Sequence, residues 1–374
     1  MAGWRGPKTA TLIWILSLHG VIALSQAAPS FNDLVEQASA AREQNDVPRA
    51  IELYTRALKV NPKWSQGWWF LGSLQYGANS FAAACDSLTE FIALAPNPAP
   101  AFSLRGLSEF ETGEYAKALA DIQQSIALGE VDRPPNGQRL RFYEGVLLTR
   151  VGRFDEAFKA YQSLVQRGTP AAEVLIGLGL AGLRLMLIPK DISENEQELV
   201  AGAGEAVYRF MIGDEKGGSK DFENLFQHFP VATNLHCLYG ALLFNSDPDL
   251  ALGQFKRELE IAPSNQRAQV LVAWSLLMRN NAEEALAYAK SAVGLAPEIA
   301  AGQLVLGRSL VELGSVQDGV EHLQHALPLD PDNLEIHIAL AKAYSRLGRK
   351  QDAERERSLS LRLAQNGMTR LALP

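Results

Sequence analysis

Two histidines and a glutamate near the C-terminal end of the chain have the spacing of metal ligands. His322 and His325 are three residues apart, which places both on one face of a helix, and Glu321 precedes them. His337 opens the helix expected next in the chain. Imidazole and carboxylate groups in such a cluster can bind zinc. The face that carries this pair is expected to lie in water, so a solvated histidine pair is favoured, and no metal or cofactor is predicted.

Two short segments resemble ligand-binding loops. The segment 213–220, GDEKGGSK, looks like a phosphate loop, but it lacks the Gly-Lys-Ser/Thr order and follows no strand. The segment 330–333, DPDN, looks like a calcium loop. Both are predicted to be turns between helices. The sequence contains neither Gly-x-Ser-x-Gly nor His-Glu-x-x-His, and it offers no paired carboxylates with a pocket, so a non-enzymatic protein is predicted.

The chain has only two cysteines, Cys85 and Cys237. They are separated by more than 150 residues of the repeats described below, beyond the ~7 Å between Cα atoms that a disulfide tolerates. No histidine or basic residue adjoins Cys85 in sequence, and the neighbour of Cys237 is a single histidine, His236. Two small buried residues are therefore favoured over a reactive thiol.

The elements that carry these residues repeat every 34 positions. Small residues and prolines recur at this interval, at Ala50, Ala84 and Ala118; at Ala251, Ala285, Gly319 and Ala353; at Pro62 and Pro96; and at Pro263, Pro297 and Pro331. Such a period indicates stacked copies of one supersecondary unit, none of which can bury its apolar face alone. The copies use nearly all of the chain and leave no room for a catalytic domain.

The repeat resembles the tetratricopeptide repeat, a helix–turn–helix of 34 residues. The matching residues in one copy are Trp68, Leu71, Gly72, Ala84, Leu88 and Pro96, and residues 300–333 form the cleanest copy. A small residue in the first helix allows the second helix to cross closely, and the proline ends the second helix. The resemblance implies an all-α fold, a right-handed α-solenoid of stacked helix–turn–helix repeats.

Two places break the period and suggest how the chain is divided. Five residues are inserted near 132–137, and the spacing from Gly179 to Gly204 falls to 25. An apolar helix is expected over 172–188, followed by helices near 196–212 and 216–229, so that one odd helix changes the direction of the superhelix near 189–200. The expected division is an N-terminal array over 28–188 with about four repeats and one extra helix, an irregular segment over 189–231, and a C-terminal array over 232–374 with a capping helix.

The N-terminus has the pattern of an export signal. Arg5 and Lys8 precede an apolar stretch over 11–24, and Ser25 and Ala27 supply the small residues that a signal peptidase reads. We expect residues 1–27 to be a signal peptide that is cleaved after Ala27. The alternative is an uncleaved anchor helix, but the apolar stretch is shorter than the ~20 residues of a membrane span. The expected location is periplasmic or extracellular, with no membrane span in the mature chain.

The charge of the chain argues against a nucleic-acid partner. The formal net charge is −7, and removing Arg5 and Lys8 with the signal gives −7 − 2 = −9. A protein that binds phosphate backbones normally carries a basic surface. The predicted partner is a protein or a peptide, and the chain is expected to be a monomer or a weak oligomer.

The family resemblance also implies where a partner binds, because the first helix of each repeat lines the concave face of the superhelix. Reading the groove positions of successive copies gives a mainly aromatic and basic set: Trp69, Phe110, Phe142, Arg150, Tyr208, Arg209, Phe244, Trp274, Arg308 and Lys342. Each aromatic residue could instead serve packing between helices. The lysine and asparagine pattern with which chaperone-binding members hold a C-terminal carboxylate is absent from these positions.

The predicted function is a non-enzymatic scaffold that binds a peptide or protein partner on the concave face, in the periplasm or outside the cell. Two alternatives stay open from the sequence. The chain could be the recruiting subunit of an enzyme complex, with chemistry in the irregular segment, or it could be a structural envelope protein that self-associates.

Overall fold

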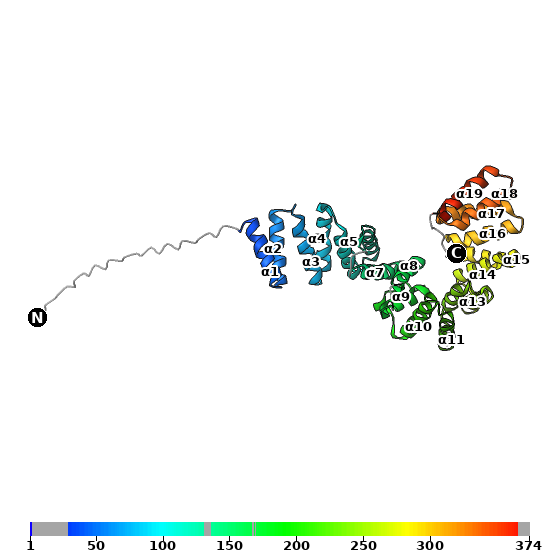
Figure 1. Ribbon diagram of the computed structural model, residues 1–374, viewed down its shortest axis with the longest axis horizontal. Helices are drawn as coiled ribbons and strands as arrows, with labels where there is room; N and C mark the ends of the chain where they lie inside the picture. The colour runs from blue at the N-terminus through cyan, green and yellow to red at the C-terminus, as the bar shows by residue number, and fades with distance from the viewer. Residues whose placement is uncertain (2–28, 131–135, 167, 169, 366–374) are drawn as a thin grey trace.

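The computed structural model describes Met1 and residues 29–130, 136–166, 168 and 170–365, and within them it contains helices and no strands (Figure 1). The expected signal peptide, most of the insertion at 132–137 and the segment after 365 lie outside the described residues. The helices are α1 (Phe31–Glu43), α2 (Val47–Val60), α3 (Ser65–Gly77), α4 (Phe81–Leu94), α5 (Ala99–Glu111), α6 (Tyr115–Ala127), α7 (Asn136–Arg150), α8 (Phe154–Val165), α9 (Ala172–Gly182), the 3-10 turn η2 (Pro189–Asp191), α10 (Glu194–Met211), α11 (Glu215–His228), α12 (Leu235–Leu243), α13 (Pro248–Ile261), α14 (Gln266–Met278), α15 (Ala282–Leu295), α16 (Ala300–Glu312), α17 (Val316–Leu329), α18 (Leu334–Arg346) and α19 (Lys350–Gln365).

Helices pack as consecutive antiparallel pairs, and we call the first helix of each pair the A helix and the second the B helix. Four pairs run from α1 to α8, and four more run from α12 to α19. Figure 1 shows α1–α8 in one row, a turn at α9–α11, and α12–α19 curving round in an arc. The chain therefore forms the all-α solenoid that the period predicts.

The small residues of the A helices mark the points where the B helices cross. A Cβ placed on Gly72 would lie 2.8 Å from Leu88 Cγ, and one on Gly307 would lie 2.7 Å from Leu323 Cγ. Real Cβ atoms almost never approach so closely, since interiors are close-packed. The 34-residue ladder of small residues therefore records close helix crossings, and it carries no chemistry.

A side-chain N–H near the start of the A helix bonds to the proline turn that precedes it. The donor atoms and the carbonyls they reach are Trp68 Nε1 to Pro62 at 2.9 Å, Gln269 Nε2 to Pro263 at 3.0 Å, Gln303 Nε2 to Pro297 at 2.8 Å, and His337 Nε2 to Pro331 at 2.9 Å. In each case the two residues are six positions apart. This bond satisfies a carbonyl at the turn between repeats, where the backbone offers no partner of its own.

The apolar helix expected over 172–188 is shorter than predicted, because α9 ends at Gly182. Arg184 adopts a left-handed conformation with φ of 55°, and Leu185 N–H donates to the Leu180 carbonyl at 2.9 Å. This six-to-one bond is the Schellman motif, which closes a helix end without requiring the proline that follows at Pro189. The expected helices near 196–212 and 216–229 are α10 and α11, displaced by one or two residues.

Three helices, α9, α10 and α11, stand between the two sets of regular pairs, and α10 packs against both of the others. No helix of the described chain is both long and apolar enough to cross a membrane, α9 included.

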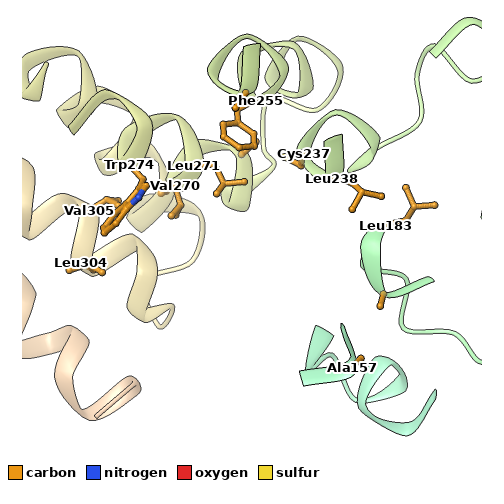
Figure 2. Packing of buried hydrophobic residues seen from close by; sticks show 14 of the residues in the cluster. Ala157, Leu183, Cys237, Leu238, Phe255, Val270, Leu271, Trp274, Leu304 and Val305 are labelled. Carbon is orange, nitrogen blue, oxygen red and sulfur yellow. The ribbon is translucent and has the colours of Figure 1, made fainter. Parts of the chain in front are cut away.

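Buried side chains form one continuous core from Leu107 to Ala353, and two smaller cores serve the first repeats. Figure 2 shows part of the continuous core, where Phe255, Leu271 and Trp274 lie along one wall of the arc. Cys237 is fully buried, and burial raises the pKa of its thiol to about 12. Cys85 is half-buried, and the same cause raises its pKa to about 11. Both cysteines are free, and neither has a lowered thiol pKa that would indicate a nucleophile.

Candidate partner-binding surface

The inner side of the arc contains a cavity of about 620 Å³ between segments far apart in sequence. One wall comes from the turn between α7 and α8 and from the end of α9, and the other comes from the starts of α14, α16 and α18. Figure 2 shows Leu183 and Ala157 on one side and Val270 and Leu304 on the other. A concavity of this size is within the range that holds a small ligand or a few residues of a peptide.

Charged residues line the two walls unequally. Asp155 and Arg184 belong to the wall formed by α8 and the end of α9, and Arg267 belongs to the opposite wall at the start of α14. Glu298, Asp330, Asp332 and Glu335 belong to the starts of α16 and α18. The starts of α16 and α18 therefore form an acidic side of the cavity, whereas the two arginines come from the two walls.

Arg184 reaches the cavity because the Schellman turn directs it away from α9. Asn234 fixes this turn from the other side, since its Nδ2 donates to the Leu183 carbonyl at 3.0 Å. The guanidinium lies over the Phe154 ring at 4.5 Å from the centroid, and Asp155 Oδ1 is 4.0 Å from its Nη1. Burial is the main cause, and the positive charge of Arg267 the second, of an Arg184 pKa lowered to about 10.

The carboxylate of Glu258 stabilises the same region through hydrogen bonds. Its side chain is fully buried, and its carboxylate accepts from Asn234 N–H at 2.6 Å, Cys237 N–H at 3.4 Å and Asn265 Nδ2 at 3.0 Å. Two of these donors are backbone amides at the start of α12, where a negative charge is favourable. Glu258 thus joins the start of α12 to the turn before α14, and α14 carries Arg267.

In the N-terminal array, the structure brings three of the predicted groove residues close to one another. Phe110 packs against Tyr143, with ring centroids 5.1 Å apart, and Phe142 packs against the same Tyr143 at 5.6 Å. Arg150 lies over the ring of Tyr115 at 5.1 Å, and Tyr115 in turn contacts Phe110. Phe110 is only 8% exposed, so most of its surface serves packing between α5 and α7. Trp69 is separate from this group and packs against Phe91 at 5.4 Å.

The predicted residues of the irregular segment and of α12 are already engaged within the chain. Arg209 contacts Asp221 at 2.7 Å and Asp214 at 3.0 Å, and it is 3.7 Å from Glu205. Tyr208 is half-buried against the core. Phe244 packs on Phe255 with centroids 6.5 Å apart.

The predicted residues of the last repeats differ in exposure. Trp274 is 7% exposed, and Arg308 covers its ring at 4.3 Å while bonding Glu335 at 3.1 Å. Lys342 is exposed and forms an ion pair with Glu312. Lys342 also lines a second, shallower hollow of about 480 Å³ at the C-terminal end, with Ile338, Arg346 and Arg357.

Arg184 and Arg267 were not among the sequence-predicted groove residues. Arg184 was assigned to a continuous apolar helix, and Arg267 was not selected although it stands one residue beyond the start of its repeat, at a groove position. A usable signal was present: Arg184 is the one charged residue between Val174 and Ile188. An isolated charge in an apolar segment indicates either a partner or an exposed position.

The residues first considered for chemistry have structural partners. His322 Nδ1 bonds Gln303 Oε1 at 2.8 Å, and burial lowers the pKa of His322, so this histidine is half-buried where a solvated one was expected. His325 is exposed, and His337 bonds Glu356 at 2.7 Å. In the described parts of the chain, no three His, Cys, Asp or Glu side chains are placed to hold a metal ion.

The segment 330–333 is a turn between helices as predicted, whereas in 213–220 only Gly213 and Asp214 lie in the turn, because α11 begins at Glu215. Gly213 has φ of 84° in the turn before α11, and Asp214 caps that helix through Gly217 N–H at 3.0 Å. Asp330–Asn333 is the turn between α17 and α18, and Asn333 caps α18. The four residues 217–220 lie inside α11.

Family models described as tetratricopeptide repeat match residues 35–99, 103–173, 241–298 and 310–366. These segments cover more than half of the chain, and the protein belongs to the tetratricopeptide repeat family.

Among curated proteins, the chain is similar to Protein FlbA of Caulobacter vibrioides, with 29% identity over 147 residues. This match covers 39% of the present chain and 24% of FlbA, so it spans about a quarter of that relative's length.

Among solved structures, a MamA fragment from Desulfovibrio magneticus RS-1 matches with 20% identity and a TM-score of 0.39, covering 44% of this chain and 94% of that one. The APC/C hetero-tetramer Cut9-Hcn1 matches with 16% identity and a TM-score of 0.42, covering 90% and 67%.

Proposed function

We propose that this protein is a non-enzymatic interaction scaffold that binds a peptide or protein segment on the concave side of its superhelix. The observation that carries the proposal is the cavity of about 620 Å³ enclosed by α7–α9 and the starts of α14, α16 and α18. Membership of the tetratricopeptide repeat family supports it, because stacked helical pairs offer an extended concave surface.

Several observations favour binding over catalysis. The residues that could have done chemistry bond within their own helix pair or helix: His322 to Gln303, His337 to Glu356, and Asp214 to its own helix start. Groups used in this way hold helices in place. The recruiting subunit of an enzyme complex would use the same concave surface, and the experiment below applies to it equally.

The proposal includes export and a division of the chain. Residues 1–27 are proposed to be a signal peptide cleaved after Ala27, on the pattern of Arg5, Lys8 and the apolar stretch that follows. The mature protein would then act in the periplasm or outside the cell, as a monomer or weak oligomer. The proposed division is an array over 28–188, an irregular segment over 189–231, and an array over 232–374.

Site-specific photo-crosslinking tests the proposed surface. The photoreactive residue p-benzoylphenylalanine replaces Trp69, Tyr208 or Lys342 at predicted groove positions, and it replaces Lys117 or Lys290 on exposed B-helix surfaces as matched controls. Irradiation in cells should give a discrete crosslinked protein from the groove positions alone. Crosslinks to a partner from Lys117 or Lys290 with none from the groove positions would place the interface on the convex side and overturn the proposal.

A further inference from the structure

Two arginines that line the cavity lack the counter-charges that their burial calls for. Arg184 has one carboxylate nearby, that of Asp155 at 4.0 Å, and the Asp155 side chain is 62% exposed to water. Arg267 is half-buried, and no carboxylate of the described residues lies within ion-pair distance of it. Both side chains line the same cavity, and the positive charge of Arg267 acts on the Arg184 guanidinium. Partly buried like charges without a full counter-charge are unfavourable.

The position of Arg267 in its helix adds to this imbalance. Arg267 is the second residue of α14. The start of a helix carries a partial positive charge, so a cation there is disfavoured by roughly 0.3–1 kcal/mol. Because the helix dipole does not favour a cation at this point, the arginine is better explained by something that it binds.

The acidic side of the cavity does not show the same imbalance. Glu298 and Asp332 stand two residues before the first residues of α16 and α18, near helix starts where acidic residues are favoured by the helix dipole. Glu335 lies in the first turn of α18 and bonds Arg308 at 3.1 Å. Asp330 accepts from Asn333 Nδ2 at 2.9 Å. These acids are stabilised by the fold, so it is the two arginines that lack a ligand of opposite charge.

Apolar residues in the same cavity indicate what accompanies that charge. Ile299 and Leu329 line the same cavity, and they are 46% and 38% exposed. Exposed branched side chains inside a concave site are typical contacts for an apolar ligand group. The cavity therefore combines a cationic pair with an apolar surface.

We infer that Arg184 and Arg267 together bind the carboxylate of an aspartate or glutamate in a partner segment, with neighbouring apolar residues of that segment on Ile299 and Leu329. The inference rests on the proposed function and specifies the chemistry of the partner. A carboxylate between the two guanidinium groups would accept charge-assisted hydrogen bonds and would remove their mutual repulsion. The rest of the segment would follow the inner surface of the arc.

Selection from a random peptide display library against the mature chain tests this inference. Bound peptides should be enriched in Asp or Glu flanked by Leu, Ile or Val. Binding of a selected peptide, measured by fluorescence anisotropy, should weaken about 10- to 100-fold in the double variant Arg184→Gln/Arg267→Gln, which is the usual loss for a charged hydrogen-bonded group. The double variant Arg184→Lys/Arg267→Lys keeps both charges and should retain most of the binding.

Two controls separate a lost contact from lost structure. Arg257→Gln removes an arginine that is 63% exposed on α13 and should leave affinity unchanged. Replacing the acidic residue of the peptide by its amide should weaken binding to the original protein, with little further loss on the Gln double variant, because one interaction is removed from both sides. Circular dichroism spectra of all variants test whether each is folded.

The outcomes distinguish the inference from the function on which it rests. Selected peptides without acidic preference, or acidic peptides that bind the Gln double variant as tightly as the original protein, would overturn the arginine site and leave the scaffold function standing. Failure to select any peptide, together with photo-crosslinks from the convex side alone, would overturn both.

Discussion

Gly179 of α9 and Gly204 of α10 meet where the two helices cross at backbone contact. A Cβ on Gly179 would lie 1.9 Å from the Val200 carbonyl oxygen, and one on Gly204 would lie 1.8 Å from the Leu175 carbonyl oxygen. No side chain fits at either position without separating the helices. This crossing lies where the array changes direction, and α9 leads directly into the turn that carries Arg184 (Figure 1).

Replacing either glycine should therefore destabilise the protein. Gly204→Ala is expected to lower the free energy of unfolding by about 3 kcal/mol, since the methyl group must displace backbone and not a flexible side chain. Urea denaturation followed by circular dichroism measures this change.

Gly253→Ala is the matched control for that substitution. Gly253 lies within α13, and a Cβ there would meet nothing within 4 Å. Alanine should stabilise this exposed helical position by about 0.5–1 kcal/mol. Equal effects of the two substitutions would contradict the close crossing of α9 and α10.

Glu109 should make stability depend on pH. Burial first, and then the negative charge of Asp121, raise the Glu109 pKa to about 7, while Arg105 and Lys117 oppose the shift and Glu114 adds to it. The folded state then binds a proton more tightly than the unfolded state, in which the pKa is near 4.5. Stability contributed by this proton is present below pH 4.5 and is lost as pH rises through about 7.

The variant Glu109→Gln removes this titration. At pH 8 it should be more stable than the original protein by about 1–2 kcal/mol, and at pH 5 the difference should be small. Thermal and urea unfolding at the two pH values measure it. A variant that is less stable than the original at pH 8 would mean that the Glu109 carboxylate is a favourable charge in the folded state.

The bond between an A-helix side chain and the proline turn should contribute measurably to stability. Gln303 is 2% exposed, and it connects the Pro297 carbonyl with His322. Gln303→Met keeps a similar length but leaves both partners unsatisfied, so we expect a loss of about 1–3 kcal/mol. Gln351→Met on exposed α19 should change stability by less than about 0.5 kcal/mol. A Gln303→Met variant as stable as this control would show that the recurring bond is neutral.

The predicted groove residues should differ in how much their replacement by alanine lowers the free energy of unfolding. Trp274→Ala empties a buried site and should cost about 3–5 kcal/mol. Lys342→Ala removes an exposed lysine and should cost about 0–1 kcal/mol. Thermal unfolding of both variants checks this order, and the reverse order would contradict the burial described for Trp274. Lys342 is therefore the more informative position for testing binding.

The period of 34 predicted most of the fold, because small residues and prolines at fixed positions reflect local contacts within one repeat. Gly72 and Leu88 are only 16 positions apart, so their contact lies within one repeat. The same helix crossing can therefore be predicted in each copy separately. The predicted end of the apolar helix over 172–188 was wrong, because the end of this helix is determined by the backbone conformation of one residue. The end of α9 at Gly182 follows from the left-handed conformation of Arg184, which a residue other than glycine or asparagine seldom adopts.

The candidate site was less predictable than the fold. Arg184 and Arg267 are 83 positions apart, and they meet only because α9–α11 turn the array back on itself (Figure 1). A repeat rule assigns groove positions copy by copy, so it contains no information on which copies come to face one another. For the same reason it gave Phe110 and Trp274 the same status as Lys342, although the structure buries the first two.

Hydrogen–deuterium exchange with and without a bound partner segment tests the central claim most directly, namely that the inner side of the arc is the binding surface. The account predicts slower exchange on binding in the turn around Arg184 and at the starts of α14, α16 and α18, with exchange on the B helices α15 and α17 unchanged. Protection confined to α15 and α17, with no change around Arg184, would contradict it.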